Sequence, residues 1–270
     1  MNINTPTLPA TPRRAMMRNI GLTAGAAGLI AASGPSVHAA ADDASLINPG
    51  AKTLQDLHAR LAKAPHRRDF KTVPMILTDP ADWDAQAIKE LVAYQGDPKQ
   101  VWDNTDLTGP WINLMRNAVN VQTYSFRKPD FLAVSITHAL AHLALFDQEL
   151  WDKYQLAKFA GGKLARNTLI DTPKAASTDP KDFNNINGVF SPNDNSITVL
   201  QRRGVVFMGC HNAIWEMTGG LLKKGINPDK LSHHQIAAEF TNHLIPGVVL
   251  TPGVVATMIY LQKAGYEYAK

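Results

Sequence analysis

Cysteine is almost missing from this chain of 270 residues. Cys210 is the single one, so the chain cannot contain an internal disulfide framework. The sequence also lacks a phosphate-cradling glycine-rich loop, a Cys-x-x-Cys pair, a Cys-x-x-Cys-His haem site and a serine nucleophile elbow. These absences argue against nucleotide-dependent and haem enzymes. No internal repeat is visible either.

A strong net charge is lacking as well once the amino terminus is set aside. The formal charge of +4 comes from 27 basic and 23 acidic side chains. Three of the basic residues, Arg13, Arg14 and Arg18, lie in the first 40 residues, where no acid occurs, so the remainder carries 24 basic and 23 acidic groups. A nearly neutral body gives no electrostatic reason to expect binding to nucleic acid or to an anionic membrane.

Long apolar runs are missing too, and the amino terminus has the parts of an export signal. A twin-arginine pattern at Pro12–Arg18 is followed by a mild apolar run at Ile20–Ala32 and small residues at Val37–Ala39. The apolar run is too short for a membrane-spanning helix, which needs roughly 20 residues. We therefore predict a twin-arginine signal over residues 1–41 and a periplasmic mature protein without a membrane span. The alternative is a disordered basic tail.

Residues 42–96 are expected to form a helical amino-terminal arm. The run Thr53–Asp56 is typical of a capping box, and the leucines that follow predict a helix to about Ala64. Residues Thr72–Leu77 are interpreted as extended. Asp79 and Pro80 predict the start of a second helix, which would end near Gly96.

Residues 97–270 alternate strand and helix patterns, which predicts an α/β domain with a mainly parallel sheet covered on both faces. The strands are expected at 100–103, 131–136, 204–209 and 247–250, and the helices at 108–121, 139–157, 193–203, 210–221, 232–244 and 253–265. An insertion at about 161–193 shows no period and contains Pro173, Pro180 and Pro192. It is interpreted either as a lid or oligomer contact or as a flexible insertion.

Cys210 lies where a buried strand is expected to turn into a helix, and ligands bind beyond the carboxyl ends of strands in open α/β sheets. Backbone N–H groups and the helix dipole at this turn would lower the pKa of its thiol and favour a nucleophilic thiolate. His211 would stabilise the anion or move a proton, and Asn212 would cap the helix. The alternative is that Cys210 is a small buried hydrophobic residue.

Further polar residues follow the first two expected strands. His138 and His142 could converge with His211 on Cys210, a donor set that would suit zinc or copper. The alternative is a helix-cap histidine and a helix-surface histidine that share no role.

Asp103 and Arg116 are candidate ligand-binding residues near the end of the first strand, together with Asn212 and His138. Arg116 would bind an anionic group. The alternative is a solvated charge on a helix face.

Three stretches of this sequence resemble the DsrE/DsrF-like family: Arg203–Asn212, Leu244–Val254 and Leu261–Tyr268. The resemblance extends from about Lys99 to Ala269. It implies a flavodoxin-like α/β sandwich that assembles into trimers or hexamers. For characterised members it also implies relay of sulfur as a cysteine persulfide, during sulfur oxidation or tRNA thiolation, and it places the family cysteine at Cys210.

The export signal, the arm and the insertion are departures from the cytoplasmic relay members of that family. The resulting hypothesis is a periplasmic, homo-oligomeric DsrE-like protein that binds a small sulfur-containing ligand or relays sulfur on Cys210, a sulfurtransferase-like carrier without a cofactor. One alternative is a non-enzymatic copper- or zinc-binding module that uses Cys210 and the three histidines. Another is an oligomeric scaffold.

Overall fold

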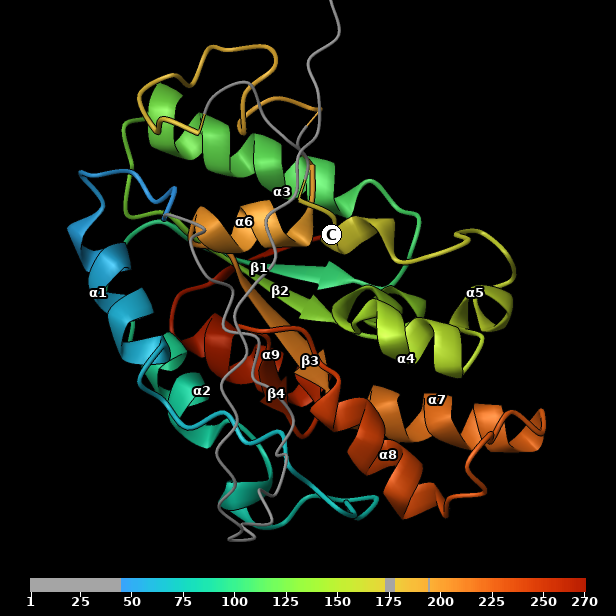
Figure 1. Ribbon diagram of the computed structural model, residues 1–270. Coiled ribbons are helices and arrows are strands. Elements are labelled where there is room, and N and C mark those ends of the chain that lie inside the picture. The colour runs from blue at the N-terminus through green and yellow to red at the C-terminus, as the bar shows by residue number, and fades with distance from the viewer. Residues whose placement is uncertain (1–44, 173–177, 194) are drawn as a thin grey trace, which may run out of the picture. The chain divides into compact units, whose positions relative to one another are not determined.

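Figure 1 shows the computed structural model, which describes residues 45–172, 178–193 and 195–270. The chain divides into two units, Met1–Ala39 and Ala40–Lys270, and every described residue belongs to the second. The expected twin-arginine signal, residues 1–41, lies outside the described residues. Within the described ranges, no helix combines the length and the apolar character needed to cross a membrane.

A parallel sheet of five strands forms the centre of the described chain. Every pairing is parallel, and the strands are arranged in the order β4-β3-β2-β1-β5. The α/β class and the parallel sheet are thus confirmed, whereas β5 was not predicted. The strands are β1 (Lys99–Asn104), β2 (Leu132–Thr137), β3 (Val206–Cys210), β4 (Val249–Thr251) and β5 (Glu267–Ala269).

Helices connect the strands and also form the arm. The arm contains α1 (Lys52–Leu61), η1 (Pro80–Asp82) and α2 (Ala85–Val92). The helices of the sheet domain are α3 (Trp111–Asn120), η2 (Val121–Ser125), η3 (Ala139–Leu145), α4 (Gln148–Lys153), α5 (Leu156–Phe159), η4 (Thr168–Ile170), α6 (Ile197–Arg202), α7 (His211–Lys223), α8 (His233–Asn242) and α9 (Val254–Lys263). A capping box between Ser232 and Gln235 starts α8, within the helix predicted at 232–244.

The two faces of the sheet carry different helices. Ser135 of β2 is paired in register with Phe207 of β3, so both side chains point to one face, and the Trp111 ring of α3 packs edge-on against Phe207 with centroids 6.2 Å apart. On the other face, α9 packs across β1, β2 and β3, and its Thr257 is hydrogen-bonded to Thr251 of β4. Right-handed connections explain this, because only the step from β4 to β5 runs back across the sheet.

The amino-terminal arm packs on the α9 face, where α2 contacts both β4 and α9 (Figure 1). Asp84, which precedes α2, is buried and accepts the Leu250 N–H of β4 at 2.7 Å. The Arg68 guanidinium donates two hydrogen bonds to the Asp84 carboxylate, at 3.2 and 2.8 Å, and one to the Val248 carbonyl. Residues Thr72–Leu77, expected to be extended, form no strand. The arm is therefore held to β4 by the buried Asp84 carboxylate together with a backbone hydrogen bond from the Asp84 N–H to the Leu250 carbonyl, at 3.0 Å.

The helix expected over residues 139–157 is broken into η3, α4 and α5. The Asp147 carboxylate accepts the Leu150 N–H at 2.9 Å and starts a new helix there. Gln155 then takes a left-handed conformation with φ of 50°, which ends α4 and separates it from α5. The prediction of one helix was wrong because the apolar spacing continues through these interruptions.

Within the 161–193 insertion, η4 contacts η3 and α6, whereas residues 178–193 pack onto α3 and η2. Phe183 stacks on the Tyr124 ring at 4.3 Å, and the buried Phe190 meets the same ring edge-on at 5.5 Å. The Phe190 carbonyl accepts hydrogen bonds from Arg116 and Asn120. Because α3 runs back from the carboxyl end of β1, these anchors lie toward the amino ends of the strands.

Candidate functional site

Cys210 ends β3 at a point where the chain leaves two adjacent strands toward opposite faces. Its partner in register is Thr251, the last residue of β4. Strand β3 continues into α7, whereas β4 continues into α9 on the other face. In open parallel sheets, ligands bind at such a switch point, beyond the carboxyl ends of the strands. The predicted position of Cys210 at a strand-to-helix turn is therefore confirmed.

Cys210 is buried, with only 5% of its surface exposed to solvent. Burial raises the pKa of the Cys210 thiol, and the nearby backbone N–H groups of Val254, Ala213 and Asn212 offset this rise only in part. These donors belong to the first turns of α9 and α7. The expected lowering of the thiol pKa is thus wrong, because desolvation outweighs the helix termini.

His142 supports Cys210 through the backbone. The Cys210 N–H donates to Nε2 of His142 at 2.9 Å, so that nitrogen carries no proton. The imidazole is fully buried, and burial lowers its pKa to about 3. His142 is therefore a neutral acceptor inside the protein and not the helix-surface histidine of the alternative interpretation.

His211 turns toward the arm. Its buried ring donates from Nε2 to the Pro74 carbonyl at 2.8 Å, and burial lowers the pKa of the imidazole. Asn212 is exposed and is the second residue of α7, whose N-cap is Cys210. The expected capping role of Asn212 is therefore wrong. Only its backbone N–H contributes to the surroundings of the sulfur.

Asp103 and His138 do come together, at the carboxyl ends of β1 and β2. Nε2 of His138 lies 2.8 Å from Oδ1 of Asp103, and the Tyr268 hydroxyl of β5 donates to Oδ2 at 2.9 Å. The hydrogen bond to Asp103 raises the pKa of the Tyr268 phenol. Ala139, directly after His138, has an unusual positive φ of 49°. The side chains of Asp103, His138 and Tyr268 thus form a partly exposed polar cluster at the ends of β1 and β2 and on the edge strand β5.

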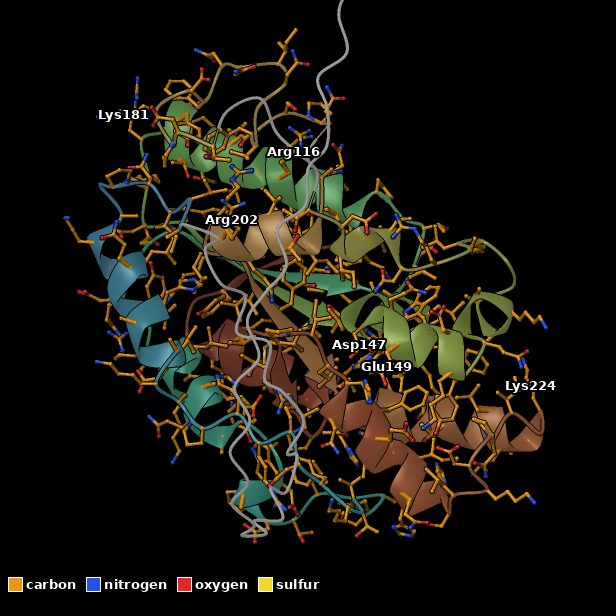
Figure 2. All side chains as sticks on the ribbon, viewed as in Figure 1. Arg116, Asp147, Glu149, Lys181, Arg202 and Lys224 are labelled. Carbon is orange, nitrogen blue, oxygen red and sulfur yellow. The ribbon has the colours of Figure 1, made fainter. Side chains whose placement is uncertain are left out.

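Arg116 lies elsewhere, on α3 beneath the insertion (Figure 2). Its guanidinium is buried and donates to the Phe190 carbonyl at 2.9 Å and to the side-chain oxygens of Asn113 and Asn117, both at 2.8 Å. The expected role in binding an anionic ligand at the strand ends is thus not supported by its position. Arg116 instead anchors the insertion.

The three histidines do not form a donor set with Cys210. Each ring nitrogen that has a hydrogen-bond partner faces a different group: Asp103 for His138, the Cys210 N–H for His142 and the Pro74 carbonyl for His211. Within the described ranges, no group of three or more His, Cys, Asp or Glu side chains could hold a metal ion.

Several contributors to these sites were missed in the sequence. Val254 and Pro74 act through the backbone, which leaves no side-chain signal. The sequence did contain a signal for Tyr268. Gly265, which has a φ of 91° at the end of the last helix, is followed by Tyr266 and Tyr268 at the alternate positions of a strand. The arrangement offers a buried thiol that three N–H groups would support as an anion.

No protein-family model matches this chain, and no curated protein matches it.

Proposed function

We propose that this protein is a DsrE-like sulfur carrier of the periplasm that binds sulfane sulfur as a persulfide on Cys210. The observation that carries the proposal is the position of Cys210 at the switch point, between the carboxyl end of β3 and the starts of α7 and α9, where the backbone N–H groups of Asn212, Ala213 and Val254 favour the thiolate. Such donors stabilise an anionic sulfur without a metal or a second cysteine. The proposed assembly is a homo-oligomer, as the sequence resemblance implies.

The proposed loading step needs no oxidant. The Cys210 thiolate attacks the outer sulfur of thiosulfate, and a new sulfur–sulfur bond forms on the protein. The sulfur–sulfur bond of thiosulfate breaks, and its electron pair leaves with sulfite. The product is the Cys210 persulfide, and a second thiolate can remove its outer sulfur by the reverse type of exchange.

The raised pKa of the thiol sets the pH dependence of this step. The thiolate is the attacking form, and at neutral pH little of it is present. The neutral His142 already accepts the Cys210 N–H, so we assign no general base. The loading rate should therefore rise with pH and should still be rising above pH 9.0, the ordinary value for the thiol.

The test is intact-mass spectrometry of the whole protein after incubation with thiosulfate or polysulfide across a pH series. We expect a mass gain of one sulfur atom, which Cys210→Ser abolishes and prior alkylation blocks. Persulfide formation that survives in Cys210→Ser refutes the proposal, as does an unmodified wild-type protein at every pH. Metal analysis of the same sample tests the alternative, because bound copper or zinc would favour the metal-binding module.

A further inference from the structure

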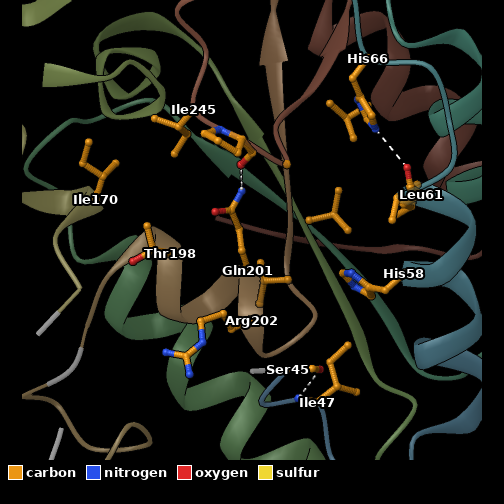
Figure 3. A pocket seen from close by; sticks show the side chains of 16 residues that line it. Ser45, Ile47, His58, Leu61, His66, Ile170, Thr198, Gln201, Arg202 and Ile245 are labelled. Carbon is orange, nitrogen blue, oxygen red and sulfur yellow. Dashed lines mark hydrogen bonds between the residues drawn. The ribbon is translucent and has the colours of Figure 1, made fainter. Parts of the chain in front are cut away.

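A large pocket of this protein lies at the end of the sheet away from Cys210. It has a volume of about 850 Å³, and its lining includes Val206 and Val249, the first residues of β3 and β4 (Figure 3). Cys210 ends β3 and does not line this pocket. The strand from Val206 to Cys210 is roughly 13 Å long at the usual rise per residue. A molecule that reacts with the thiol is therefore expected to approach from the carboxyl ends of the strands.

The amino-terminal arm crosses those carboxyl ends between two attachment points. At the first, Nε2 of His211, the residue after Cys210, donates to the Pro74 carbonyl at 2.8 Å. At the second, the Asp84 N–H donates to the Leu250 carbonyl at 3.0 Å, and the Asp84 carboxylate accepts the Leu250 N–H at 2.7 Å. Leu250 precedes the register partner of Cys210 in β4. The chain from Pro74 to Asp84, which we call the strap, therefore passes from the start of α7 to the end of β4; Figure 1 shows it in the cyan-to-teal trace that leads into α2.

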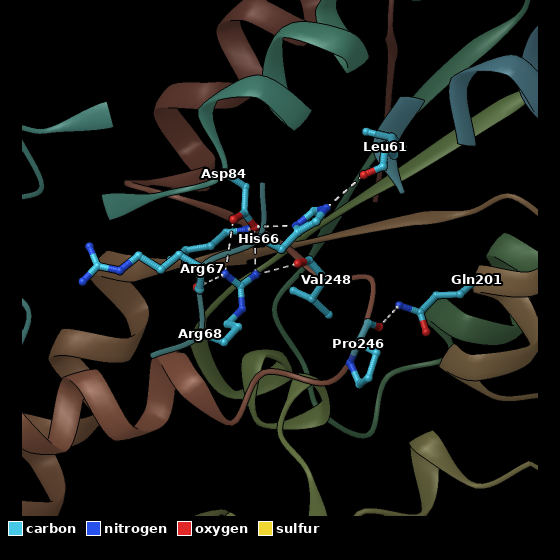
Figure 4. Close-up of polar contacts among 9 residues, drawn as sticks. Leu61, His66, Arg67, Arg68, Asp84, Gln201, Pro246 and Val248 are labelled. Atoms are coloured by element: carbon cyan, nitrogen blue, oxygen red, sulfur yellow. Dashed lines mark hydrogen bonds and ion pairs between the residues drawn. The ribbon is translucent and has the colours of Figure 1, made fainter. Parts of the chain in front are cut away.

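Both ends of the strap are held by groups outside it. Next to the first attachment, the Val73 N–H donates to the His234 carbonyl at 3.1 Å, and Nδ1 of His234 lies 2.9 Å from the Val73 carbonyl. At the second, the Arg68 guanidinium donates to the buried Asp84 carboxylate (Figure 4). The two ends are thus fixed to α8 and to β4.

The middle of the strap is attached more weakly. Among residues 75–83, all of which the structure describes, Leu77 alone is buried, with 6% of its surface exposed. Its neighbours Met75 and Ile76 are 53% and 64% exposed. Leu77 belongs to the main hydrophobic core, so one buried side chain ties the middle of the strap to the rest of the protein.

The strap also borders the residue that follows Cys210 at more than one point. Burial lowers the pKa of the His211 imidazole. The groups that oppose this lowering all belong to the strap, and they are the backbone of Pro74 and Met75 and the carboxylate of Asp82. The strap therefore continues alongside His211 beyond the Pro74 hydrogen bond, and Cys210, next in the chain, is itself buried.

We propose that the strap is a lid over Cys210 and that Leu77 is the latch that keeps it closed. In the open state Leu77 leaves the core while the ends at Val73 and Asp84 stay bonded, and a small sulfane donor such as thiosulfate reaches the thiol. A segment with one buried side chain opens at a lower free-energy cost than the whole domain. The role of the lid in sulfur transfer rests on the chemistry proposed for Cys210, whereas its opening can be measured without sulfur.

The test is the rate at which iodoacetamide alkylates Cys210 in the purified whole protein, followed by intact-mass spectrometry. Leu77→Ala removes most of the latch, and we expect it to raise the rate constant at least about tenfold. Leu77→Val is a milder deletion and should give a smaller increase, so that the rates rank Ala, Val and wild type in descending order. Unchanged rates in both variants overturn the proposal.

Two control variants separate lid opening from general destabilisation. Ile76→Ala removes an exposed side chain next to the latch, and Leu61→Ala removes a buried leucine of α1 that lines the pocket away from Cys210. We expect both to react within about twofold of the wild type, because neither changes the attachment of the strap. An increase in Leu61→Ala equal to that in Leu77→Ala would mean that only unfolding of the whole domain exposes Cys210, and it would overturn the lid.

A pH series completes the test, because the thiolate is the form that is alkylated. Lid opening changes the rate by the same factor at every pH, whereas a change in the pKa of the thiol makes the factor vary with pH. An increase in Leu77→Ala that varies with pH in this way overturns the lid. Because alkylation needs no sulfane donor, the result is independent of whether Cys210 forms a persulfide.

Discussion

Replacement of Asp84 by asparagine tests how much its buried carboxylate contributes to holding the arm on the sheet. Asp84 is 1% exposed and accepts hydrogen bonds from Arg68 and from the Leu250 N–H, with His66 at 3.2 Å. Asp84→Asn keeps the size of the side chain and an acceptor for Leu250. It leaves two cations without their counter-charge. The expected result is a folded protein with lower stability and a loosened arm.

The magnitude follows from the burial of the three side chains. Removal of one partner from a fully buried ion pair costs about 3–5 kcal/mol. The side chains of Arg68 and His66 are 19% and 28% exposed, so water compensates for part of the lost interaction with the carboxylate. We expect Asp84→Asn to lower the free energy of unfolding by ~2–3 kcal/mol. With a urea dependence near 2–3 kcal/mol/M, the midpoint falls by about 1 M.

The pH dependence of the difference between wild type and Asp84→Asn checks the mechanism. Burial alone would raise the pKa of Asp84, but hydrogen bonds from His66 and Arg68 lower it below 3.8. Its contribution is therefore present above pH 3.8 and is lost as pH falls through the lower folded value. The pKa of His66 is raised above 6.5, so its contribution is complete below pH 6.5 and is lost as pH rises through the folded value.

The stability difference should therefore be largest between these two values and should shrink on both sides. Urea titrations monitored by tryptophan fluorescence across pH provide the measurement. Asp56→Asn, on the exposed side of α1, is the control and should change stability by less than about 0.5 kcal/mol. A stability difference of that small size for Asp84→Asn, or one that does not vary with pH, would refute the reasoning.

Two further predictions concern buried polar groups. His142→Leu leaves the Cys210 N–H without its acceptor and should lower the free energy of unfolding by about 1–3 kcal/mol. Because the pKa of His142 is about 3 in the folded protein and 6.5 in the unfolded reference, wild-type stability should fall as pH drops below 6.5, and the variant should lose part of that slope. Urea titrations measure both effects, and identical acid slopes would contradict the second. Arg116→Met removes one of the two side-chain donors to the Phe190 carbonyl, the other being Asn120, and should increase amide hydrogen exchange in the insertion. Lys181→Met, a control on the exposed surface of the insertion, should not increase it, and equal exchange in the two variants would contradict the anchoring role.

Much of the sheet could be predicted because its central strands are buried on both faces. The run Phe131–Ile136 is continuously apolar apart from one serine, and it became β2. Ser232 and Gln235 also gave a local signal that was sufficient, since both hydrogen bonds of the capping box form within four residues. Signals of this kind depend only on neighbours in the sequence.

Other elements depend on contacts that local patterns do not contain. The N–H of Leu54 in α1 is accepted by Asp130, 76 positions away, and the expected capping box at Thr53 does not form. Among the described residues, strand β5 pairs with β1 alone and has mostly exposed side chains, so it lacks the apolar signal of a buried strand.

The candidate site also has features that local sequence predicts and features that depend on distant contacts. The strand-to-helix turn predicts where Cys210 lies. The direction of its pKa depends on burial, to which the distant start of α9 contributes, and is not predictable from the turn alone. Arg116 was misplaced for a related reason, because its carbonyl partner Phe190 is 74 positions away.

The pairing of β1 with β5 has a consequence for how the chain is made. β1 is the first strand to leave the ribosome and β5 is the last, and the hydrogen bond between Asp103 and Tyr268 joins positions 165 apart. A nascent chain therefore carries β1 with one open edge from the time β1 is made until β5 has been added. During that interval the open edge can pair with other chains, which is a recognised route to aggregation.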